Sequence, residues 1–487
     1  MAGGYFGGGA GTAASPYLVE DADDLNSVRN NLSAHFRQTE HIDFALWGAW
    51  TPIGDFEGSY DGDDHVIANM EMNAAEAGIF ATTDGASFAN MLLFNIDVTG
   101  DSLVGSLAGD ARNSTFTDVA VIASRVEGDE YVGGLIGRAI SCSLDFIRVA
   151  CDIHITDDTV SSSNYVGGII GVCGLGSGDY LKRSYYKGTV TVASQWGASF
   201  VGGLVGYLSG FASSMVSECE SYLFADGFEG WFVGGAFGGC YDRTKIQDCY
   251  SRSDIQAINP VTSESGGFVG GFIGEYFPEG DKPAGEYYDH LQRCYSASYV
   301  EGGSWNNKPP GGFAGSTHPV GIYTPDCYFD STLHGSTTNM GGAEARTTAQ
   351  MTWEHGATTY TGWDFATIWM ADRSHRLNAG YPMFHRTVGI VEGEGKLSGL
   401  AKFVTVLLVG AVQVSTQLWA DLVAFIETTI LLSGTINVQT YLAILQKLLM
   451  WAKREGVYEP VEAYARHNGS YLQVTHVYKR EDGTYRE

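Results

Sequence analysis

A glycine-pair motif that recurs through the middle of the chain limits what the chain can fold into. The motif has seven residues: an aromatic residue, valine, two glycines, two apolar residues and a last glycine. Clear copies begin at Tyr131, Tyr165, Phe200, Phe232 and Phe268. A weaker copy begins at Leu103, a worn one covers 311–315, and the first glycines of successive copies lie 28, 34, 35, 32, 36 and 41 residues apart. A period in this range is typical of a solenoid, a propeller or an array.

The segments between the motifs have the pattern of short β-strands. Polar and apolar residues alternate in 116–122, 152–156 and 188–193, which favours strands over helices. Paired glycines let neighbouring backbones approach closely at a corner, where a Cβ atom would clash. We therefore predict an all-β fold, a parallel β-solenoid over residues 46–345, with a propeller as the alternative. The structural glycines of the repeat are Gly133, Gly134, Gly167, Gly168, Gly202, Gly203, Gly234, Gly235, Gly270 and Gly271.

Cysteines recur at nearly the same phase in the later repeats. Four of them stand between polar or aromatic residues, namely Cys219, Cys249, Cys294 and Cys327. Because strand side chains alternate between faces, inward cysteines imply that their neighbours point outward. Inward thiols would pack as small core groups and need no disulfides. The eight cysteines of the chain show neither a C-x-x-C pair nor zinc-type spacing, so we predict no metal site and no cofactor.

The outward neighbours of these cysteines supply two candidate sites. Tyrosines in register would form an exposed aromatic ladder that binds sugar rings or apolar surfaces, or that only stabilises neighbouring coils. The ladder residues are Tyr185, Tyr250, Tyr295 and Tyr328. On the other side of the cysteines, Glu218, Asp248 and Asp326 form a carboxylate column, and paired carboxylates are what glycoside hydrolysis requires. In an acidic chain, such a column is also expected as a solvated face.

The flanks of the repeat indicate how its ends are closed. Within residues 1–45, the amphipathic stretch 21–32 has acids in its first turn and predicts a short helix that caps the open edge of the solenoid. Residues 346–388 contain Trp363, Trp369 and the sequence Gly-Tyr-Pro-Met-Phe. They resemble the usual closing segment of the repeat family named in the next paragraph, which implies that they cap the other end.

The glycine motif and both flanks resemble the GLUG repeat, which is found in bacterial surface adhesins and in tail proteins of viruses that infect bacteria or archaea. The resemblance covers about residues 10–385. It implies a β-solenoid that displays a surface to its surroundings.

The chain changes character after Arg386. Residues 389–450 are apolar, lack glycine pairs and alternate with a period of two, which favours strands, with helices at 415–430 and 438–453 as the alternative. Strands this apolar need a partner surface, which predicts a homo-oligomer, with a trimer favoured, or attachment to a particle. Residues 451–487 carry Asn-Gly and Asp-Gly turns and predict a terminal β-hairpin module, similar to the ending of viral tail and fibre proteins.

Charge and motifs exclude several classes of protein. Fifty-six acidic and 28 basic residues give a net charge of −28, which repels nucleic acid and anionic membranes. The apolar stretch 403–450 is interrupted by charged and amide residues before a membrane span accumulates. No phosphate-binding loop, nucleophile elbow, zinc-protease helix or calcium loop occurs in the sequence. We therefore predict no catalytic residues and no enzyme activity.

Together these patterns predict a virion structural protein, a tail fibre or spike that attaches to the host cell. Its expected partners are other virion proteins and a host receptor or surface glycan, and its expected location is the virion, extracellular in use. Residues 1–9 lack the charged and apolar regions of a secretory signal, which favours a virion protein over the first alternative, a cell-surface adhesin. The second alternative is a polysaccharide depolymerase that uses Glu218 and Asp248.

Overall fold

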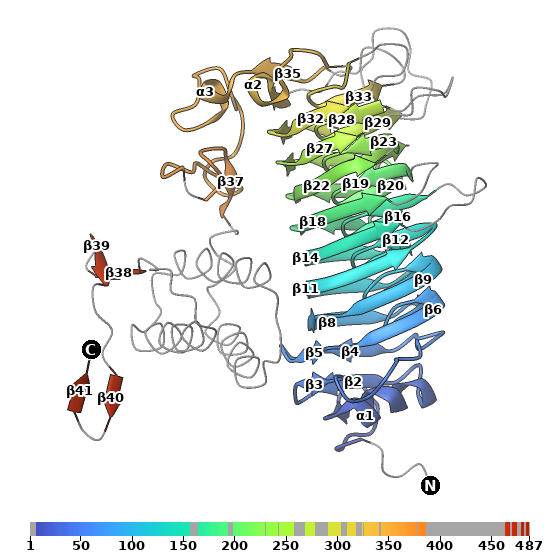
Figure 1. Ribbon diagram of the computed structural model, residues 1–487. Helices are drawn as coiled ribbons and strands as arrows, with labels where there is room; N and C mark the ends of the chain where they lie inside the picture. The colour runs from blue at the N-terminus through green and yellow to red at the C-terminus, as the bar shows by residue number, and fades with distance from the viewer. Residues whose placement is uncertain are drawn as a thin grey trace. The chain divides into compact units, whose positions relative to one another are not determined.

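The chain divides into two compact units, Met1–His385 and Arg386–Glu487. The computed structural model describes residues 6–155, 164–192, 198–257, 268–277, 291–302, 309–317 and 324–385, apart from residues 229, 242, 325, 340, 341 and 376, and four strands between residues 463 and 486. The first unit is a parallel β-solenoid, as predicted, and its coils stack in chain order (Figure 1). The propeller alternative is wrong, because strands of successive repeats pair in parallel rather than as separate antiparallel blades.

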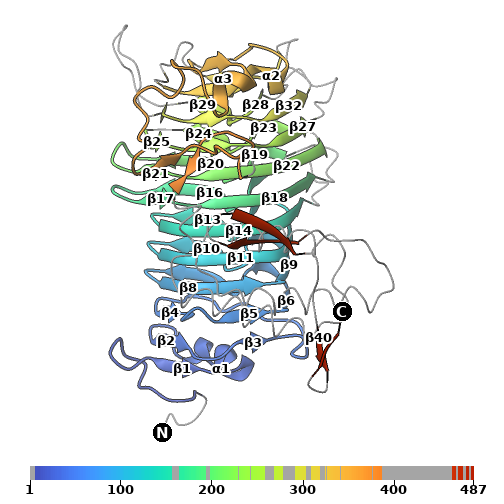
Figure 2. The same ribbon diagram turned by 90° about the vertical axis from the view of Figure 1, so that its left-hand side faces the viewer.

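Each coil contributes strands to two sheets. The smaller sheet contains, in spatial order, β33 (Ala314–Thr317), β29 (Ile273–Phe277), β24 (Phe237–Tyr241), β20 (Val205–Gly210), β16 (Ile170–Leu175), β13 (Ile136–Ile140), β10 (Ala108–Arg112) and β7 (Phe80–Asp84). The glycine motifs supply β12 (Tyr131–Gly133), β15 (Tyr165–Gly167), β19 (Ala198–Gly202), β23 (Gly230–Gly234) and β28 (Phe268–Gly270) to the larger sheet. Each motif therefore turns the chain from one sheet into the other (Figure 2).

The remaining strands of the larger sheet form the other walls of the coils. The early ones are β1 (Tyr17–Val19), β2 (His35–Gln38), β3 (Ile42–Asp43), β4 (Ser59–Asp61), β5 (Val66–Ala68), β6 (Glu71–Ala77), β8 (Ser87–Phe94) and β9 (Asp97–Val104). The later ones are β11 (Thr115–Gly128), β14 (Ser143–Ile155), β17 (Tyr180–Lys182), β18 (Tyr185–Val192), β21 (Met215–Ser217), β22 (Glu220–Phe228), β25 (Lys245–Gln247), β26 (Tyr250–Ser251), β27 (Asp254–Ala257), β30 (Leu291–Gln292), β31 (Tyr295–Ser296), β32 (Tyr299–Gly302), β34 (Tyr328–Asp330) and β35 (Glu344–Arg346).

The motif glycines stand in register at the corner, as predicted. Gly133, Gly167 and Gly202 pair across successive coils, and the column continues through Gly234 and Gly270. Backbone fills the space around them: a Cβ atom on Gly167 would lie 1.9 Å from the carbonyl oxygen of Ile170. Real Cβ atoms do not approach this closely, so glycine is required here for space and not for a left-handed backbone.

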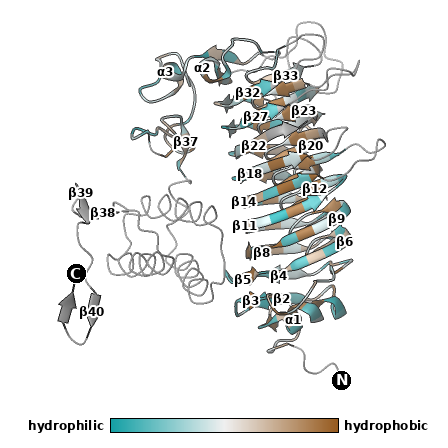
Figure 3. Cartoon of the chain, in the orientation of Figure 1, coloured by the Kyte–Doolittle hydropathy of each residue, from teal (hydrophilic) through white to brown (hydrophobic). Residues whose placement is uncertain are grey.

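The core lies inside the coils and is lined by the inward side chains of both sheets. Apolar and polar residues alternate along the strands (Figure 3). Cys219, Cys249, Cys294 and Cys327 all point into this core, at 1% exposure or less, so their inward orientation is confirmed. All eight cysteines lie in the described part of the chain, and each is a buried free thiol. The thiols therefore serve as small core groups.

The N-terminal end is covered by the predicted helix, which is shorter than expected. Helix α1 (Ala22–Ser27) is followed by a 3-10 turn, η1 (Val28–Asn30). The side chain of Asp21 caps the helix by accepting a hydrogen bond from the Asp24 amide at 2.9 Å. Ser27, Asn30 at the end of η1 and Asn31 after it are residue types whose side chains compete with helical hydrogen bonds, which accounts for the early end of the helix.

Residues 347–385, which we call the clasp, fold back along the wall of the last coils. The clasp follows helix α2 (Ser331–His334) and β35, and contains helix α3 (Thr348–Met351) and the antiparallel strands β36 (Trp369–Met370) and β37 (Met383–Phe384). Figures 1 and 2 both show it returning beside the solenoid.

The second unit contains two antiparallel hairpins, as expected for the chain end. They are β38 (Ala463–His467) with β39 (Ser470–Val474), and β40 (Lys479–Glu481) with β41 (Thr484–Arg486). The apolar segment 389–450, with its strand and helix alternatives, lies outside the described residues. Among the helices that the structure describes, none has the length and apolar character needed to cross a bilayer.

Candidate binding surface

The predicted tyrosine column exists, but it is not exposed. Tyr250, Tyr295 and Tyr328 pair in register on β26, β31 and β34, while Glu220 lies between Tyr185 and Tyr250 in the column. Tyr250 and Tyr295 are 0% exposed and Tyr328 is 4% exposed, whereas Tyr185 is half-buried. The expected exposed ladder is therefore wrong for three of the four tyrosines.

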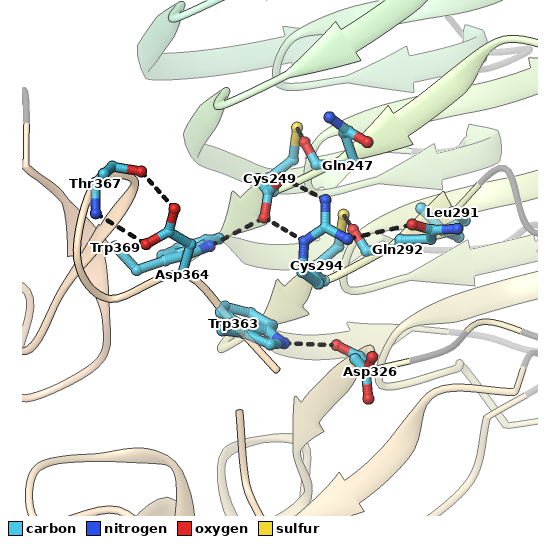
Figure 4. Close-up of polar contacts among 12 residues, drawn as sticks. Gln247, Cys249, Leu291, Gln292, Cys294, Asp326, Trp363, Asp364, Thr367 and Trp369 are labelled. Carbon is cyan, nitrogen blue, oxygen red and sulfur yellow. Dashed lines mark hydrogen bonds and ion pairs between the residues drawn. The ribbon is translucent and has the colours of Figure 1, made fainter. Parts of the chain in front are cut away.

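The clasp is the physical reason for this burial. Trp369, Phe384 and Tyr381 lie against the column, with ring centroids 6.1 and 5.3 Å from Tyr250 for the first two and 6.0 Å from Tyr295 for the third. The Trp369 indole donates a hydrogen bond to Asp248 at 3.1 Å (Figure 4). Tyr250 and Tyr295 therefore pack against a second layer of the same chain, and burial raises their pKa values well above normal.

An asparagine joins the clasp to the wall. The Asn378 amide donates to the hydroxyl of Tyr295 at 2.9 Å and to the carbonyl of Pro382 at 2.8 Å. Its side-chain oxygen accepts from Arg252 at 2.7 Å and from Tyr222 at 3.2 Å. The interface between clasp and solenoid is thus hydrogen-bonded as well as apolar.

The carboxylate column is also in place, but its central member has a structural role. Glu218, Asp248 and Asp326 all adopt a left-handed backbone, with φ of 52°, 51° and 57°, at the same corner of their coils, but Arg293 occupies this position in the coil between Asp248 and Asp326. Asp248 is 1% exposed and accepts two hydrogen bonds from Arg293, at 2.8 and 2.7 Å, besides the bond from Trp369. Figure 4 shows Trp363 and Trp369 of the clasp beside the coil residues Cys249 and Cys294. Asp248 is therefore not available to a polysaccharide substrate.

A different aromatic row is accessible, and it is formed by the first residue of each glycine motif. Its members, on β12, β15, β19, β23 and β28, are Tyr131, Tyr165, Phe200, Phe232 and Phe268. Successive ring centroids lie 5.4, 5.2, 4.7 and 5.9 Å apart, with interplanar angles of 1°, 8°, 20° and 27°. Every member is half-buried. The row crosses five coils without interruption.

A second row lies beside the first on the smaller sheet. Tyr207, Tyr241 and Phe277 stand on β20, β24 and β29, with successive centroids 4.9 and 5.7 Å apart. Their rings meet the first row nearly at right angles, for example at 87° between Phe200 and Tyr207. Gly239 makes room for this contact, since a Cβ atom there would lie 2.7 Å from the Phe200 ring. We call these eight residues the aromatic corner.

Charged groups border the aromatic corner. The Arg138 guanidinium lies 5.8 Å from the centre of the Tyr131 ring and is bonded to Asp110 at 2.7 and 3.0 Å. Further along, the hydroxyl of Tyr241 donates to the Glu275 carboxylate. Burial, and then this hydrogen bond, raise the pKa of Tyr241, so it remains a neutral donor.

Asp110 provides a test of these charges. Burial alone would raise its pKa, but the hydrogen bonds and charges of Arg138 and Arg112 outweigh burial and lower it. A carboxyl with a lower pKa in the folded state stabilises the fold above its unfolded pKa of about 3.9, and this contribution is lost as the pH falls through the folded pKa. We expect Asp110→Asn to lower the free energy of unfolding by about 2 kcal/mol at pH 7.

The measurement is urea unfolding of both proteins at pH 7 and at pH 3, where the difference should shrink. Asp97→Asn is the matched control, because the Asp97 side chain is 53% exposed and its ion pair is looser, with 3.5 Å between its carboxylate oxygen and the Arg125 guanidinium. Asp97→Asn should lower the free energy of unfolding by less than about 1 kcal/mol. If Asp110→Asn lowered the free energy of unfolding equally at pH 7 and at pH 3, the ion pairs of Asp110 with Arg138 and Arg112 would not be the cause of the loss.

The aromatic corner was missed in the sequence, although a signal was present. An aromatic residue begins every clear copy of the glycine motif, but strand alternation does not show which way a side chain at a corner points, so the sequence predicts the binding ladder beside the cysteines instead. Among the described residues, no group of three or more His, Cys, Asp or Glu side chains is arranged to hold a metal ion.

Comparison with known proteins links the chain to several large proteins. No family model matches it. It is 31% identical over 147 residues to halomucin of Haloquadratum walsbyi, which covers 26% of this chain and 2% of that protein. It is 26% identical over 224 residues to an immunoglobulin A1 protease of Streptococcus pneumoniae, which covers 46% of this chain and 11% of the protease. The chain thus spans only a small part of these relatives.

Two further comparisons involve a membrane protein and a solved structure. A putative Gly-rich membrane protein of Evansella cellulosilytica is 30% identical over 185 residues, which is 28% of this chain and 21% of that protein. A crystal structure of a putative immunoglobulin A1 protease from Bacteroides ovatus aligns with 79% of this chain and 96% of its own, at 17% identity and a TM-score of 0.37.

These relatives overturn two expectations from the sequence. The virion tail fibre or spike is wrong, because the related proteins are immunoglobulin A1 proteases, a halomucin and a putative membrane protein, and not virion components. The same proteases contradict the expectation that the chain has no enzyme activity. The expected extracellular location agrees with these secreted or cell-surface relatives, whereas a location on a virion has no support.

Proposed function

We propose that residues 6–385 are the recognition module of an extracellular protein, and that the aromatic corner is its contact surface for glycan-bearing macromolecules. One observation carries the proposal: eight aromatic side chains lie in two adjoining rows on the outside of the solenoid, and all of them remain half-buried. The clasp fully buries Tyr250 and Tyr295 of the other aromatic column, whereas every residue of the aromatic corner keeps part of its surface exposed.

Physical chemistry supports a binding role for such a surface. Contiguous exposed apolar patches on soluble proteins mark interaction sites. Tyrosine and phenylalanine offer large contact areas with little side-chain entropy to lose, and tyrosine adds a hydroxyl for polar groups of the ligand. Repetition along the solenoid lets several weak contacts act together on one large ligand.

The resemblance of the repeat to GLUG, found in bacterial surface adhesins, also supports an adhesive role. The streptococcal relatives suggest a candidate ligand, immunoglobulin A1, the protein named in those proteases. Mucin serves as a second, heavily glycosylated probe. The chain matches only 11% of those proteases, so the proposal concerns the shared segment and not the whole enzyme.

The first test is binding of the full chain to immobilised immunoglobulin A1 and mucin. Phe200 lies at the centre of both rows, so we expect Phe200→Ala to weaken binding about tenfold or more, as is usual for a central aromatic anchor. Tyr299→Ala is the control, because Tyr299 is 43% exposed on a different wall. Melting curves would show that both variants fold. Equal binding by the two variants would remove the aromatic corner from recognition.

The protease relatives favour a second candidate function, proteolysis of immunoglobulin A1. The test is incubation of the full chain with immunoglobulin A1, followed by electrophoresis of the heavy chain. New heavy-chain fragments that require the chain would assign the activity, and an intact heavy chain after prolonged incubation would reject it.

A further inference from the structure

We infer that the clasp is an acid-operated cover, which leaves the wall of the last coils at low pH while the coils themselves stay folded. Its release uncovers the tyrosine column of Tyr250, Tyr295 and Tyr328, and so adds a second aromatic surface that is hidden at neutral pH. The inference goes beyond the proposed function and does not depend on the aromatic corner.

Buried carboxylates lie where the clasp meets the wall. Three acidic side chains there are each 1% exposed, namely Asp248, Asp330 and Asp372. Asp248 accepts a hydrogen bond from the Trp369 indole at 3.1 Å. Asp330 accepts one from the Tyr381 hydroxyl at 2.6 Å. Hydrogen bonds to an ionised acceptor are about twice as strong as those between neutral groups, so protonation of these carboxylates weakens the attachment of the clasp.

Asp372 organises the loop of the clasp that carries Asn378. Its Oδ2 atom accepts hydrogen bonds from the amides of Leu377, Asn378 and Gly380, at 3.1, 2.8 and 3.0 Å. Its Oδ1 atom accepts one from the Ser374 hydroxyl at 2.8 Å. Burial alone would raise the pKa of Asp372, but these hydrogen bonds outweigh burial and lower it. Asp372 therefore stabilises the clasp above its unfolded pKa of about 3.9, and this contribution is lost as the pH falls through the folded pKa.

The charged and titratable groups that face these carboxylates act in the same direction. Arg293 donates two hydrogen bonds to Asp248, and the guanidinium of Arg252 lies 5.3 Å from the centre of the Tyr381 ring. The other cationic neighbours are Arg346 on the wall and Arg373 and His375 on the clasp, and the other ionisable neighbours are Glu220, Tyr222, Tyr250 and Tyr360. Arginine and protonated histidine keep their charge in acid, whereas each carboxylate becomes neutral. Acid therefore leaves unbalanced positive charge on both sides of the interface.

The coils are held by contacts that acid leaves intact. Tyr250 and Tyr295 pair across successive coils through backbone N–H and C=O groups, which do not titrate, and the same kind of pairing continues along the solenoid. The clasp strands β36 and β37 pair with each other instead. The clasp meets the wall through the side chains of Trp369, Tyr381 and Asn378. We therefore expect the clasp to open at a higher pH than the pH at which the coils unfold.

The test is hydrogen–deuterium exchange of the full chain at pH 7, 5 and 3, followed by mass spectrometry and corrected for the effect of pH on the intrinsic exchange rate. Between pH 5 and pH 3, peptides from 347–385 should lose about tenfold in protection relative to peptides from 165–175 and 200–210, because one pKa unit is a tenfold change in an equilibrium constant. Equal loss in both sets of peptides would indicate general acid unfolding and overturn the inference. Full protection of the clasp at pH 3 would overturn it as well.

Variants assign the effect to Asp372. Asp372→Asn keeps the size of the side chain but removes the charge that accepts these hydrogen bonds, so the clasp should exchange rapidly at pH 7 and change little further at pH 3. Tyr381→Phe removes the donor to Asp330 and leaves Asp372 in place, so it should raise the pH at which the clasp opens. Glu354→Gln, at an exposed carboxylate of the clasp, is the control and should exchange as the unaltered chain does. Protection of the coil peptides shows that each variant is folded, and an unchanged loss between pH 5 and pH 3 in Asp372→Asn would remove Asp372 from the switch.

Discussion

Gly234→Ala is expected to prevent the solenoid from folding stably, with a loss of more than about 4 kcal/mol in the free energy of unfolding. The added Cβ atom would lie 1.9 Å from the carbonyl oxygen of Phe237 and 2.6 Å from the amide nitrogen of Gly274. Both atoms belong to the backbone, and the second lies in the next coil. A side-chain shift cannot relieve these contacts, so the two coils would have to separate.

The measurement is guanidinium unfolding followed by circular dichroism. Gly54→Ala is the matched control, because its Cβ atom would meet only the Thr82 hydroxyl at 3.7 Å, an ordinary contact. It should change the free energy of unfolding by less than about 1 kcal/mol. If Gly234→Ala unfolded at the same midpoint as Gly54→Ala, the glycine column would not set the coil spacing.

This prediction rests on the part of the fold that could be read from the sequence. The glycine pairs recur once per coil and need close backbone contact, so they fixed both the solenoid and its register. Alternation within the strands placed Cys249 and its equivalents inside, because the period of two is a local property of each strand. Such features can be predicted from the sequence because they depend only on neighbouring residues within a strand and on the repetition of one motif.

The candidate site could not be predicted in the same way. Alternation showed that Tyr250 and Tyr295 leave the coil, but their burial depends on Trp369, which is more than seventy residues away in the sequence and has no repeat. The accessible row presented the opposite difficulty. Tyr165 and Phe200 were visible as repeated aromatics, but the direction of a side chain at a corner depends on how the backbone turns there, and strand alternation does not determine it.

The clasp itself gives the second large prediction. Trp369 is 0% exposed and contacts Trp363 and Phe384 at centroid distances of 4.4 and 4.6 Å, besides its hydrogen bond to Asp248. Trp369→Ala should lower the free energy of unfolding by about 3–5 kcal/mol, the usual loss for a large buried aromatic residue. Because the clasp covers the tyrosine column, its release should also expose Tyr250 and Tyr295.

Two further variants separate packing from hydrogen bonding in this interface. Trp369→Phe keeps a ring in the pocket but removes the N–H donor, so it should lose about 1.5–3 kcal/mol, the contribution of a bond to a charged acceptor, plus any loss of ring contact. Trp47→Ala, at an exposed tryptophan, should lose almost nothing. Thermal melting measures all three, and limited proteolysis locates the change.

In Trp369→Ala, cleavage should concentrate within residues 347–385 while the coils resist, because the coils keep their own core and backbone pairing. Uniform digestion of the whole solenoid would mean that the clasp is an integral part of its stability. Resistance equal to that of the unaltered chain would mean that Trp369 does not hold the clasp in place. The contrast with the aromatic corner is physical: both are aromatic columns on parallel coils, and the rings that no clasp covers are half-buried, whereas Tyr250 and Tyr295 are fully buried.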